Sequence, residues 1–180
     1  MLFGSKILFG CNQCGECCRQ VQVPLCHEDL LRLIKRFKDR PLEDWLHFHP
    51  IEDHHPDALK LNGRSVLLTL RTRLPEGGCR MLLDNACSIY EDRPIVCRTF
   101  PFQLQKKQLQ ISPEFELLVS LACEKKTFKE QKSKRQEIQH SEVLFRKYRK
   151  LLRQWNQETA QDPDKQRFEH FVKFLEHMQD

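Results

Sequence analysis

Cysteine is the residue type with the clearest chemical potential in this chain of 180 residues, which contains nine cysteines. The segment CNQCGECC places four thiols within eight residues, and the last two are adjacent. A second group follows the spacing C-x7-C-x9-C, and a single cysteine comes after it. Thiols gathered in this way form disulfides, hold a metal or carry out redox chemistry. The eight candidates are Cys11, Cys14, Cys17, Cys18, Cys79, Cys87, Cys97 and Cys123.

A disulfide framework is disfavoured by the cysteine pattern. An odd number of cysteines leaves one without a partner, and the adjacent pair Cys17 and Cys18 would need two different, well-placed partners. The opening segment MLFGSKILFG is too short for a secretory signal, and its length also argues against LFGC as a lipoprotein processing site. No apolar run approaches the ~18 residues that span a bilayer. We therefore expect a cytoplasmic protein without a membrane span, in a compartment that keeps thiols reduced.

The spacing of the first cysteines favours a metal site. Cys11, Cys14 and Cys17 form C-x2-C-x2-C, the spacing of three ligands of a ferredoxin-type cluster, whose fourth ligand comes from elsewhere. Zinc sites use the same C-x-x-C pairs with a second pair far along the chain. Gly15 supplies the backbone angles that such a turn needs. Both cofactors stay open, and the triplet favours [4Fe–4S] over zinc.

Three cysteines need separate treatment. Cys17 and Cys18 are awkward ligands for one ion because consecutive side chains point apart, so one of them is expected to face a second centre or to be a spare thiol. Cys26 directly precedes an amphipathic helical pattern, where Ser or Thr commonly caps a helix, and it is left out of the ligand set. The eight remaining thiols suffice for two four-thiolate sites or for one larger cluster.

The elements that must position the second group are short. The apolar runs 66–73 and 80–83, on either side of a Gly-Gly pair, predict strands, and the following Asp-Asn pair predicts a turn. A short helix with Pro94 in its first turn is expected next. Cys97 then lies where amide groups and the helix dipole favour a thiolate. Arg93 and Arg98 are expected to offset the charge of a thiolate-rich site or to form surface ion pairs.

The quoted cysteine segments, CNQCGECC and CRMLLDNACSIYEDRPIVCRTFPF, closely resemble those of the CxxCxxCC (YkgJ-like) family of zinc- or iron-chelating domains. Flagellin lysine N-methylase is similar to this family in its cysteine pattern. The resemblance covers the chain from Cys11 to Cys123, with Cys123 as a late member. It implies that the eight candidate cysteines form a shared metal-binding set, and it implies no established activity.

Other motifs are weak. A histidine group in HFHPIEDHHP is expected to be a polar loop more often than a metal site, and it comprises His47, His49, His54 and His55. HEDLL lacks the second histidine of a zinc protease. The chain has only six glycines and no Gly-rich phosphate or nucleotide loop, which disfavours a methylase activity. Tyr90 is expected to pack beside the cluster, with a catalytic acid as the alternative.

The sequence changes character after Cys123. Residues 125–153 hold eleven Lys or Arg and three Glu, a local charge of +8 within a net charge of +5. Apolar residues at helical spacing predict one helix here and a second after a cap at Asp162. The stripes are Ile138, Phe145, Tyr148, Leu152 and Trp155 in the first helix, and Phe168, Phe171, Val172, Leu175 and Met178 in the second.

These patterns predict a small α+β protein, predominantly helical, with short β-hairpins around a thiolate metal site and a C-terminal helical hairpin. We expect a cysteine-rich metal-binding domain over 1–124 and a basic antiparallel hairpin over 125–180 packed on it. The predicted function is to bind an iron–sulfur cluster or zinc. The alternatives are a protein-modifying or redox enzyme that uses the cluster, and a metal-stabilised module for nucleic acid, which is less favoured than a solvated basic face. A protein or small-molecule partner cannot be named from the sequence.

Overall fold

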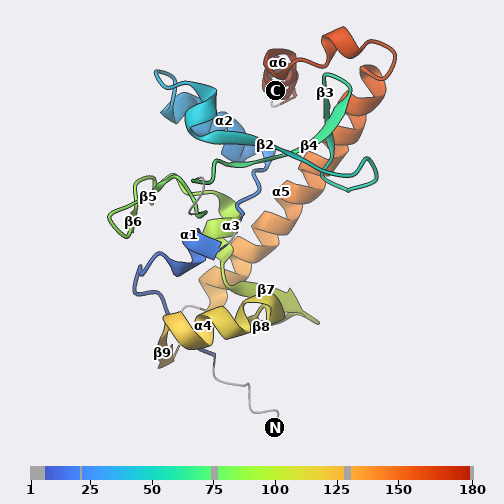
Figure 1. The fold of residues 1–180 in the computed structure, drawn as a ribbon. Coiled ribbons are helices and arrows are strands. Elements are labelled where there is room, and N and C mark those ends of the chain that lie inside the picture. The colour runs from blue at the N-terminus through green and yellow to red at the C-terminus, as the bar shows by residue number, and fades with distance from the viewer. Residues whose placement is uncertain (1–6, 21, 74–76, 128–130, 179–180) are drawn as a thin grey trace.

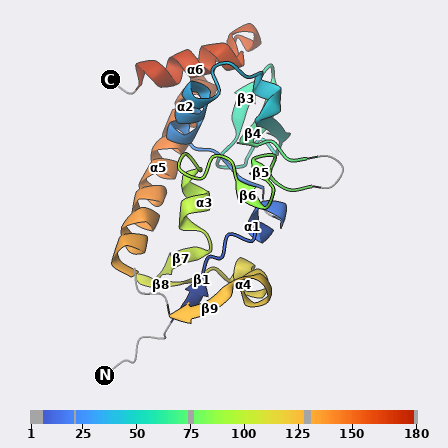
Figure 2. The same ribbon diagram turned by 90° about the vertical axis from the view of Figure 1, so that its left-hand side faces the viewer.

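The computed structural model describes residues 7–20, 22–73, 77–127 and 131–178, and confirms the predicted α+β class. Its longest element is the helix α5 (Gln131–Glu158), along which the other elements are arranged (Figure 1). All of the paired strands described are antiparallel. The molecule is organised as two hydrophobic cores at opposite ends of α5, with the cysteine segments between them (Figures 1 and 2).

A three-stranded sheet lies in the first core, in the order β2-β4-β3. β4 covers Arg64–Leu70, so the strand predicted over 66–73 starts and ends earlier than expected. Buried residues on β4 alternate only in part, because the strand lies in the centre of the sheet and contacts protein on both faces. The outer strands are β2 (Leu46–Pro50) and β3 (Leu59–Leu61).

Three helices cover the first core. The helix α2 (His27–Arg36) begins after Cys26, as predicted, and packs beside α5 and α6 (Phe168–His177). The predicted apolar stripe of α5 is confirmed, since Tyr148, Leu152 and Trp155 are buried there. The indole ring of Trp155 meets the ring of Phe171 edge-on, with centroids 5.3 Å apart. This contact joins the two C-terminal helices.

The C-terminal region differs from the sequence prediction at its boundaries. Residues Glu124–Thr127 form the strand β9, so the helix expected from 125 begins at Gln131. Asp162 precedes a single 3-10 turn, η3 (Pro163–Lys165), and α6 starts only at Phe168. Pro163 is the first residue of this turn, and the chain leaves the helical conformation again before α6 begins. α6 then lies across the end of α5 rather than antiparallel to it (Figures 1 and 2).

The second core lies at the other end of α5. Its buried side chains include Phe9, Phe102 and Ile138, and the rings of Phe9 and Phe102 meet edge-on with centroids 5.1 Å apart. The strand β1 pairs with β9 here, which brings the start of the chain beside the residues that precede α5. The elements are β1 (Leu8–Gly10), β7 (Phe102–Gln105), β8 (Gln108–Ile111), the 3-10 turn η2 (Pro113–Phe115) and α4 (Glu116–Ala122).

The short elements between the two cores carry most of the cysteines. The strand predicted over 80–83 is reduced to the two residues of β5. These connecting elements are α1 (Glu16–Gln20), β5 (Leu82–Leu83), β6 (Ala86–Cys87) and α3 (Ile95–Thr99), and a 3-10 turn η1 (Leu42–Asp44) precedes β2.

The predicted division of the chain at residue 124 stays a prediction. Buried side chains from both sides of this position pack together in the first core, for example Leu30 with Leu152 in one cluster. None of the helices in the described part of the chain is both long and apolar enough to cross a membrane.

Candidate metal centre

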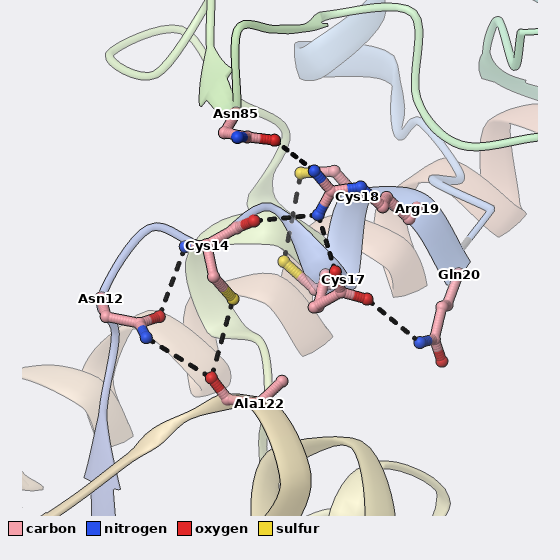
Figure 3. A network of polar contacts seen from close by, with 9 residues as sticks. Asn12, Cys14, Cys17, Cys18, Arg19, Gln20, Asn85 and Ala122 are labelled. Carbon is pink, nitrogen blue, oxygen red and sulfur yellow. Dashed lines mark hydrogen bonds and ion pairs between the residues drawn. The ribbon is translucent and has the colours of Figure 1, made fainter.

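The first cysteine segment is a tight loop between β1 and α1. Gln13 and Gly15 have φ angles of 57° and 78°, so the chain turns sharply around Cys14. The Asn12 carboxamide accepts a hydrogen bond from the Cys14 amide (3.3 Å) and donates one to the carbonyl of Ala122 (3.4 Å). The Cys14 Sγ also donates to that carbonyl at 3.8 Å (Figure 3). Asn12 therefore fixes the C-x-x-C loop against the end of α4.

Gly15 was predicted to allow this turn, and the structure confirms the prediction. Its φ of +78° is unfavourable for residues with a side chain. A Cβ at this position would also lie 2.8 Å from Leu82 of β5. The loop thus approaches the second cysteine group closely because residue 15 has no side chain.

A second glycine joins the two cysteine groups. Gly78 has a φ of +83°, and a Cβ there would lie 3.2 Å from the Cys18 carbonyl oxygen. This close approach lets the Cys79 amide donate to the same carbonyl at 2.5 Å. The backbone of α1 and the backbone before β5 are therefore in direct contact.

Arg19 connects the same two segments through its side chain. Its Nη1 donates to the Cys14 carbonyl at 2.9 Å and to the Glu16 carboxylate at 2.7 Å, and its Nη2 donates to the Asn85 carboxamide (Figure 3). Asn85 lies in the turn between β5 and β6, where the predicted turn is confirmed by its φ of 63°. Sequence reasoning missed Arg19, because its partners lie in two separate segments.

The second cysteine group is spread over three elements. Cys79 is buried and bridges to Thr72 in a short antiparallel contact, and Cys87 ends β6 opposite Leu82. Cys97 is the third residue of α3, the short helix that follows Pro94 as predicted.

Asp29 holds the helix that carries Cys97. Its carboxylate is 1% exposed, accepts a hydrogen bond from the Ile95 amide at 3.1 Å, and forms an ion pair with Arg32 at 2.7 Å. It also accepts from the Cys26 amide and the Cys26 Sγ, at 3.4 and 3.2 Å. Cys26 is therefore the N-cap residue of α2, as predicted. Its side chain is fully buried and its thiol contacts Asp29.

The eight candidate cysteines come from five separate segments, and all of them line one cavity of about 750 Å³, which we call the thiol cavity. Cys26 does not line it. The cavity lies between the two cores and also has apolar walls from Phe9, Phe100 and Phe115. The structure thus brings the candidate set together around one space. Whether these residues bind a metal stays a prediction.

The thiols fall into two groups, which we call neighbourhoods, according to which cysteines raise the pKa of one another. The first neighbourhood surrounds Cys97. Burial raises the pKa of the Cys97 thiol well above its usual range, with further contributions from Cys79, Cys17 and Cys87. Burial likewise raises the pKa of Cys79 to about 11.

The second neighbourhood surrounds Cys123. Burial raises the pKa of the Cys123 thiol to about 11, with contributions from Cys14, Cys11 and Cys17. Cys17 belongs to both neighbourhoods. A hydrogen bond with Cys18 raises the pKa of the Cys17 thiol most, the two Sγ atoms being 4.0 Å apart.

The prediction that the helix dipole favours a Cys97 thiolate is wrong for the metal-free chain. α3 is only five residues long, so its dipole is small, whereas burial and three neighbouring cysteines act in the opposite direction. Burial and the neighbouring cysteines therefore favour the protonated form of this thiol.

The donor set fits zinc and iron–sulfur clusters, because both are held by soft thiolate ligands. Within the described residues, no three side chains of His, Cys, Asp or Glu are arranged closely enough to hold one ion. The candidate cysteines thus share one cavity without forming a preformed three-ligand group among the described residues.

Three cationic side chains also line the thiol cavity: Arg93, Arg98 and Lys134. The guanidinium of Arg93 lies over the ring of Tyr90, 3.8 Å from its centroid. The Arg98 Nε is buried without a hydrogen-bond partner in the described structure. The carboxylate of Asp92, next to Arg93 in the sequence, pairs with Arg36 at 3.5 Å. Both arginines therefore have the position needed to offset thiolate charge.

The histidine group gives no compact site. The rings of His47 and His49 lie 6.0 Å apart on β2, while His54 and His55 are exposed in the following loop. Tyr90 lines the thiol cavity and is partly exposed, with Arg93 as its ring partner.

Several basic side chains of α5 contact the protein itself. Arg149 forms a paired contact with the Asp57 carboxylate at 2.7 and 3.1 Å. Lys134 donates to the Arg98 carbonyl at 2.8 Å, and Arg135 donates to the Lys107 carbonyl at 2.9 Å. Part of the predicted basic face is thus used to attach α5 to its neighbours. Residues 128–130 of the predicted basic segment lie outside the described residues.

A thiol-lined cavity between small antiparallel sheets and helices defines a cysteine-rich protein with the donor set of a metal-chelating domain. The model of the CxxCxxCC family, described as "Putative zinc- or iron-chelating domain", matches residues 10–138, and the chain belongs to this family. The matched region contains all eight candidate cysteines and confirms the resemblance drawn from their spacing. Comparisons with curated proteins and with solved structures found no match.

Proposed function

We propose that the chain binds a metal centre through the eight cysteines that line the thiol cavity, with iron–sulfur favoured over zinc. The observation that carries this proposal is the convergence of thiols from five separate segments on one cavity of about 750 Å³. Cys26, by contrast, is buried in the first core and does not line this cavity. Membership of a zinc- or iron-chelating family supports the same conclusion.

The two electrostatic neighbourhoods support two four-thiolate centres. One would use Cys79, Cys87 and Cys97, and the other Cys11, Cys14 and Cys123. Cys17 and Cys18 then provide the fourth ligand of each centre. They are consecutive on the helix α1, where neighbouring side chains point about 100° apart, so that one residue faces each centre.

The chain's own residues prepare the site in three ways. Arg19 and Asn12 hold the C-x-x-C loop, and Asp29 holds the helix that carries Cys97. Arg98 and Lys134 offset the charge of the thiolates. A bound iron–sulfur cluster would supply one-electron chemistry, whereas zinc would supply structural stability.

Anaerobic purification followed by elemental analysis and visible absorption tests this proposal. We expect a brown protein with iron and sulfide in equal amounts, whereas zinc would give a colourless protein with two equivalents. Protein purified under these conditions without bound iron or zinc, and unable to take up either, would refute metal binding.

Matched variants test the division into two centres. Cys14→Ser and Cys87→Ser should each lose about half of the metal, and the double variant should lose all of it. Cys26→Ser is the control and should keep its full content, because Ser also caps a helix and can donate to Asp29. Complete loss in each single variant would instead indicate one shared cluster.

A further inference from the structure

A second cavity lies on the other side of the strand segment that carries Cys79. Its volume is about 790 Å³, and we call it the arginine cavity because four arginines line it. Among the described residues, two aspartates line it as well, Asp39 and Asp44. The described charged side chains that line the cavity therefore sum to a formal charge of +2. The four arginines are Arg40, Arg71, Arg73 and Arg80.

Strand alternation explains why three of the arginines share one face. Thr72 bridges Cys79 in antiparallel register, and the Arg80 amide donates to the Arg71 carbonyl at 2.8 Å. Successive side chains of a strand point to opposite faces, so Arg71, Arg73 and Arg80 lie on one face while Thr72 and Cys79 lie on the other. The first face lines the arginine cavity, and Cys79 lines the thiol cavity.

This gathering of cations is incompletely neutralised by the protein. Like charges directly opposite on an antiparallel pair, here Arg71 and Arg80, are destabilising. Within the described residues, Asp44 approaches Arg80 at 3.5 Å, and the Arg73 guanidinium donates to the Leu82 carbonyl. Arg40 lies over the ring of Phe37, 5.3 Å from its centroid. An anion placed between Arg71 and Arg80 would relieve this repulsion.

We propose that the arginine cavity binds a small phosphate-bearing anion, of the size of a diphosphate or a phosphate ester. Guanidinium groups match the oxygen geometry of phosphate through paired hydrogen bonds, and four arginines line this cavity. Ser88 also lines this cavity, and Met81 and Leu83 add apolar walls for the remainder of an ester. The volume lies within the range of about 300–1,000 Å³ that is usual for small-molecule sites.

The site is separate from the proposed metal centre. It lies on the opposite face of the strand pair, and none of its arginines lines the thiol cavity. Metal content and anion binding can therefore be measured independently, and loss of one does not entail loss of the other.

Calorimetric titration of the purified full chain with inorganic pyrophosphate tests the proposal. We expect a dissociation constant below about 1 mM with one anion per chain. Arg71→Gln and Arg80→Gln should each weaken binding about tenfold, while metal content stays unchanged and the melting temperature does not fall, because each change also removes the repulsion between the two cations. Arg64→Gln is the matched control, because Arg64 is an exposed arginine at the far end of β4 that does not line the cavity, and it should bind normally.

A charge-conserving variant keeps the test decisive if either glutamine variant fails to fold. Arg71→Lys should also weaken binding several-fold, since Lys lacks the planar fork of Arg. The proposal is overturned if pyrophosphate does not bind at about 1 mM, or if Arg64→Gln weakens binding as much as Arg71→Gln does. Binding of a single-stranded oligonucleotide without binding of pyrophosphate would also overturn it, in favour of an extended nucleic-acid surface.

Discussion

Replacement of Asp29 by Ala should destabilise the protein and misplace the helix that carries Cys97. Asp29 is 1% exposed and accepts from the Ile95 amide, the Cys26 amide and Arg32. Removing the carboxylate leaves the buried Ile95 donor without a partner, which costs about 1–3 kcal/mol. The hydrogen bond to the charged Arg32 contributes about 1.5–3 kcal/mol, at the lower end here because the Arg32 side chain is 33% exposed.

The summed loss is about 2.5–4.5 kcal/mol, a large part of the ~5–15 kcal/mol by which a domain is usually stable. Urea unfolding of the purified protein measures this loss directly, and elemental analysis of the same sample measures the consequence for the metal. Asp29→Asn is the matched comparison. It keeps an acceptor for Ile95 and should lose only about 1–2 kcal/mol.

Two results would refute this reasoning. If Asp29→Ala changed the free energy of unfolding by less than about 0.5 kcal/mol, the buried carboxylate would not hold the structure as its contacts indicate. If Asp29→Ala and Asp29→Asn lost equal stability, the charge of the carboxylate, and not its acceptor role toward Ile95, would be the cause.

Further predictions concern the backbone, pH and metal loading. Gly78→Ala should lower the free energy of unfolding by about 1–3 kcal/mol and reduce metal content, because the new Cβ would meet the Cys18 carbonyl. Gly77→Ala is the control, since Gly77 has a similar φ and open space around it, and it should lose only about 1 kcal/mol and keep the metal. Equal effects of the two changes in urea unfolding would contradict this. Burial lowers the pKa of His27 below 6.5, so the unfolded chain gains a proton before the folded one as pH falls. The free energy of unfolding should therefore be fully maintained above pH 6.5 and fall below it, and a His27→Phe variant that shows the same acid sensitivity would exclude this residue as the cause. Zinc binding at pH 7 should release about one proton per ligating thiol, four per ion, because thiols such as Cys79, with a pKa of about 11, are protonated before the metal binds. A pH indicator in weak buffer measures the protons released. Release of fewer than one proton per ion would contradict the prediction.

The sequence predicts the local features of the site well. The spacing of the cysteines identifies the residues that line one cavity and the family to which the chain belongs. Cys26 is recognised as a helix cap from its position before an amphipathic pattern, and the burial of Tyr148 and Trp155 follows from helical spacing. These features depend on residues a few positions apart, where backbone geometry alone determines which side chains share a face.

The contacts that close the site could not be predicted in the same way. Asp29 acts on Ile95 across 66 positions, and Arg19 reaches Asn85 across the same separation. A single Asp or Arg in a charged sequence is normally a surface residue. Only the packing of distant segments brings Asp29 to the Ile95 amide and Arg19 to the Asn85 carboxamide. The strand β9 was missed because its residues, EKKT, are strongly polar, and their pairing with β1 depends on a strand at the other end of the chain.

The long separation between Asn12 and Ala122 has a consequence for synthesis. These residues are 110 positions apart and meet at the wall of the thiol cavity. At the usual ~5–20 residues per second, the first cysteines are translated about 5–20 s before Cys123. During this interval the C-x-x-C thiols have neither the α4 carbonyl nor Cys123 beside them. The wall of the thiol cavity that Asn12 and Ala122 form can therefore close only after almost all of the matched domain has been synthesised.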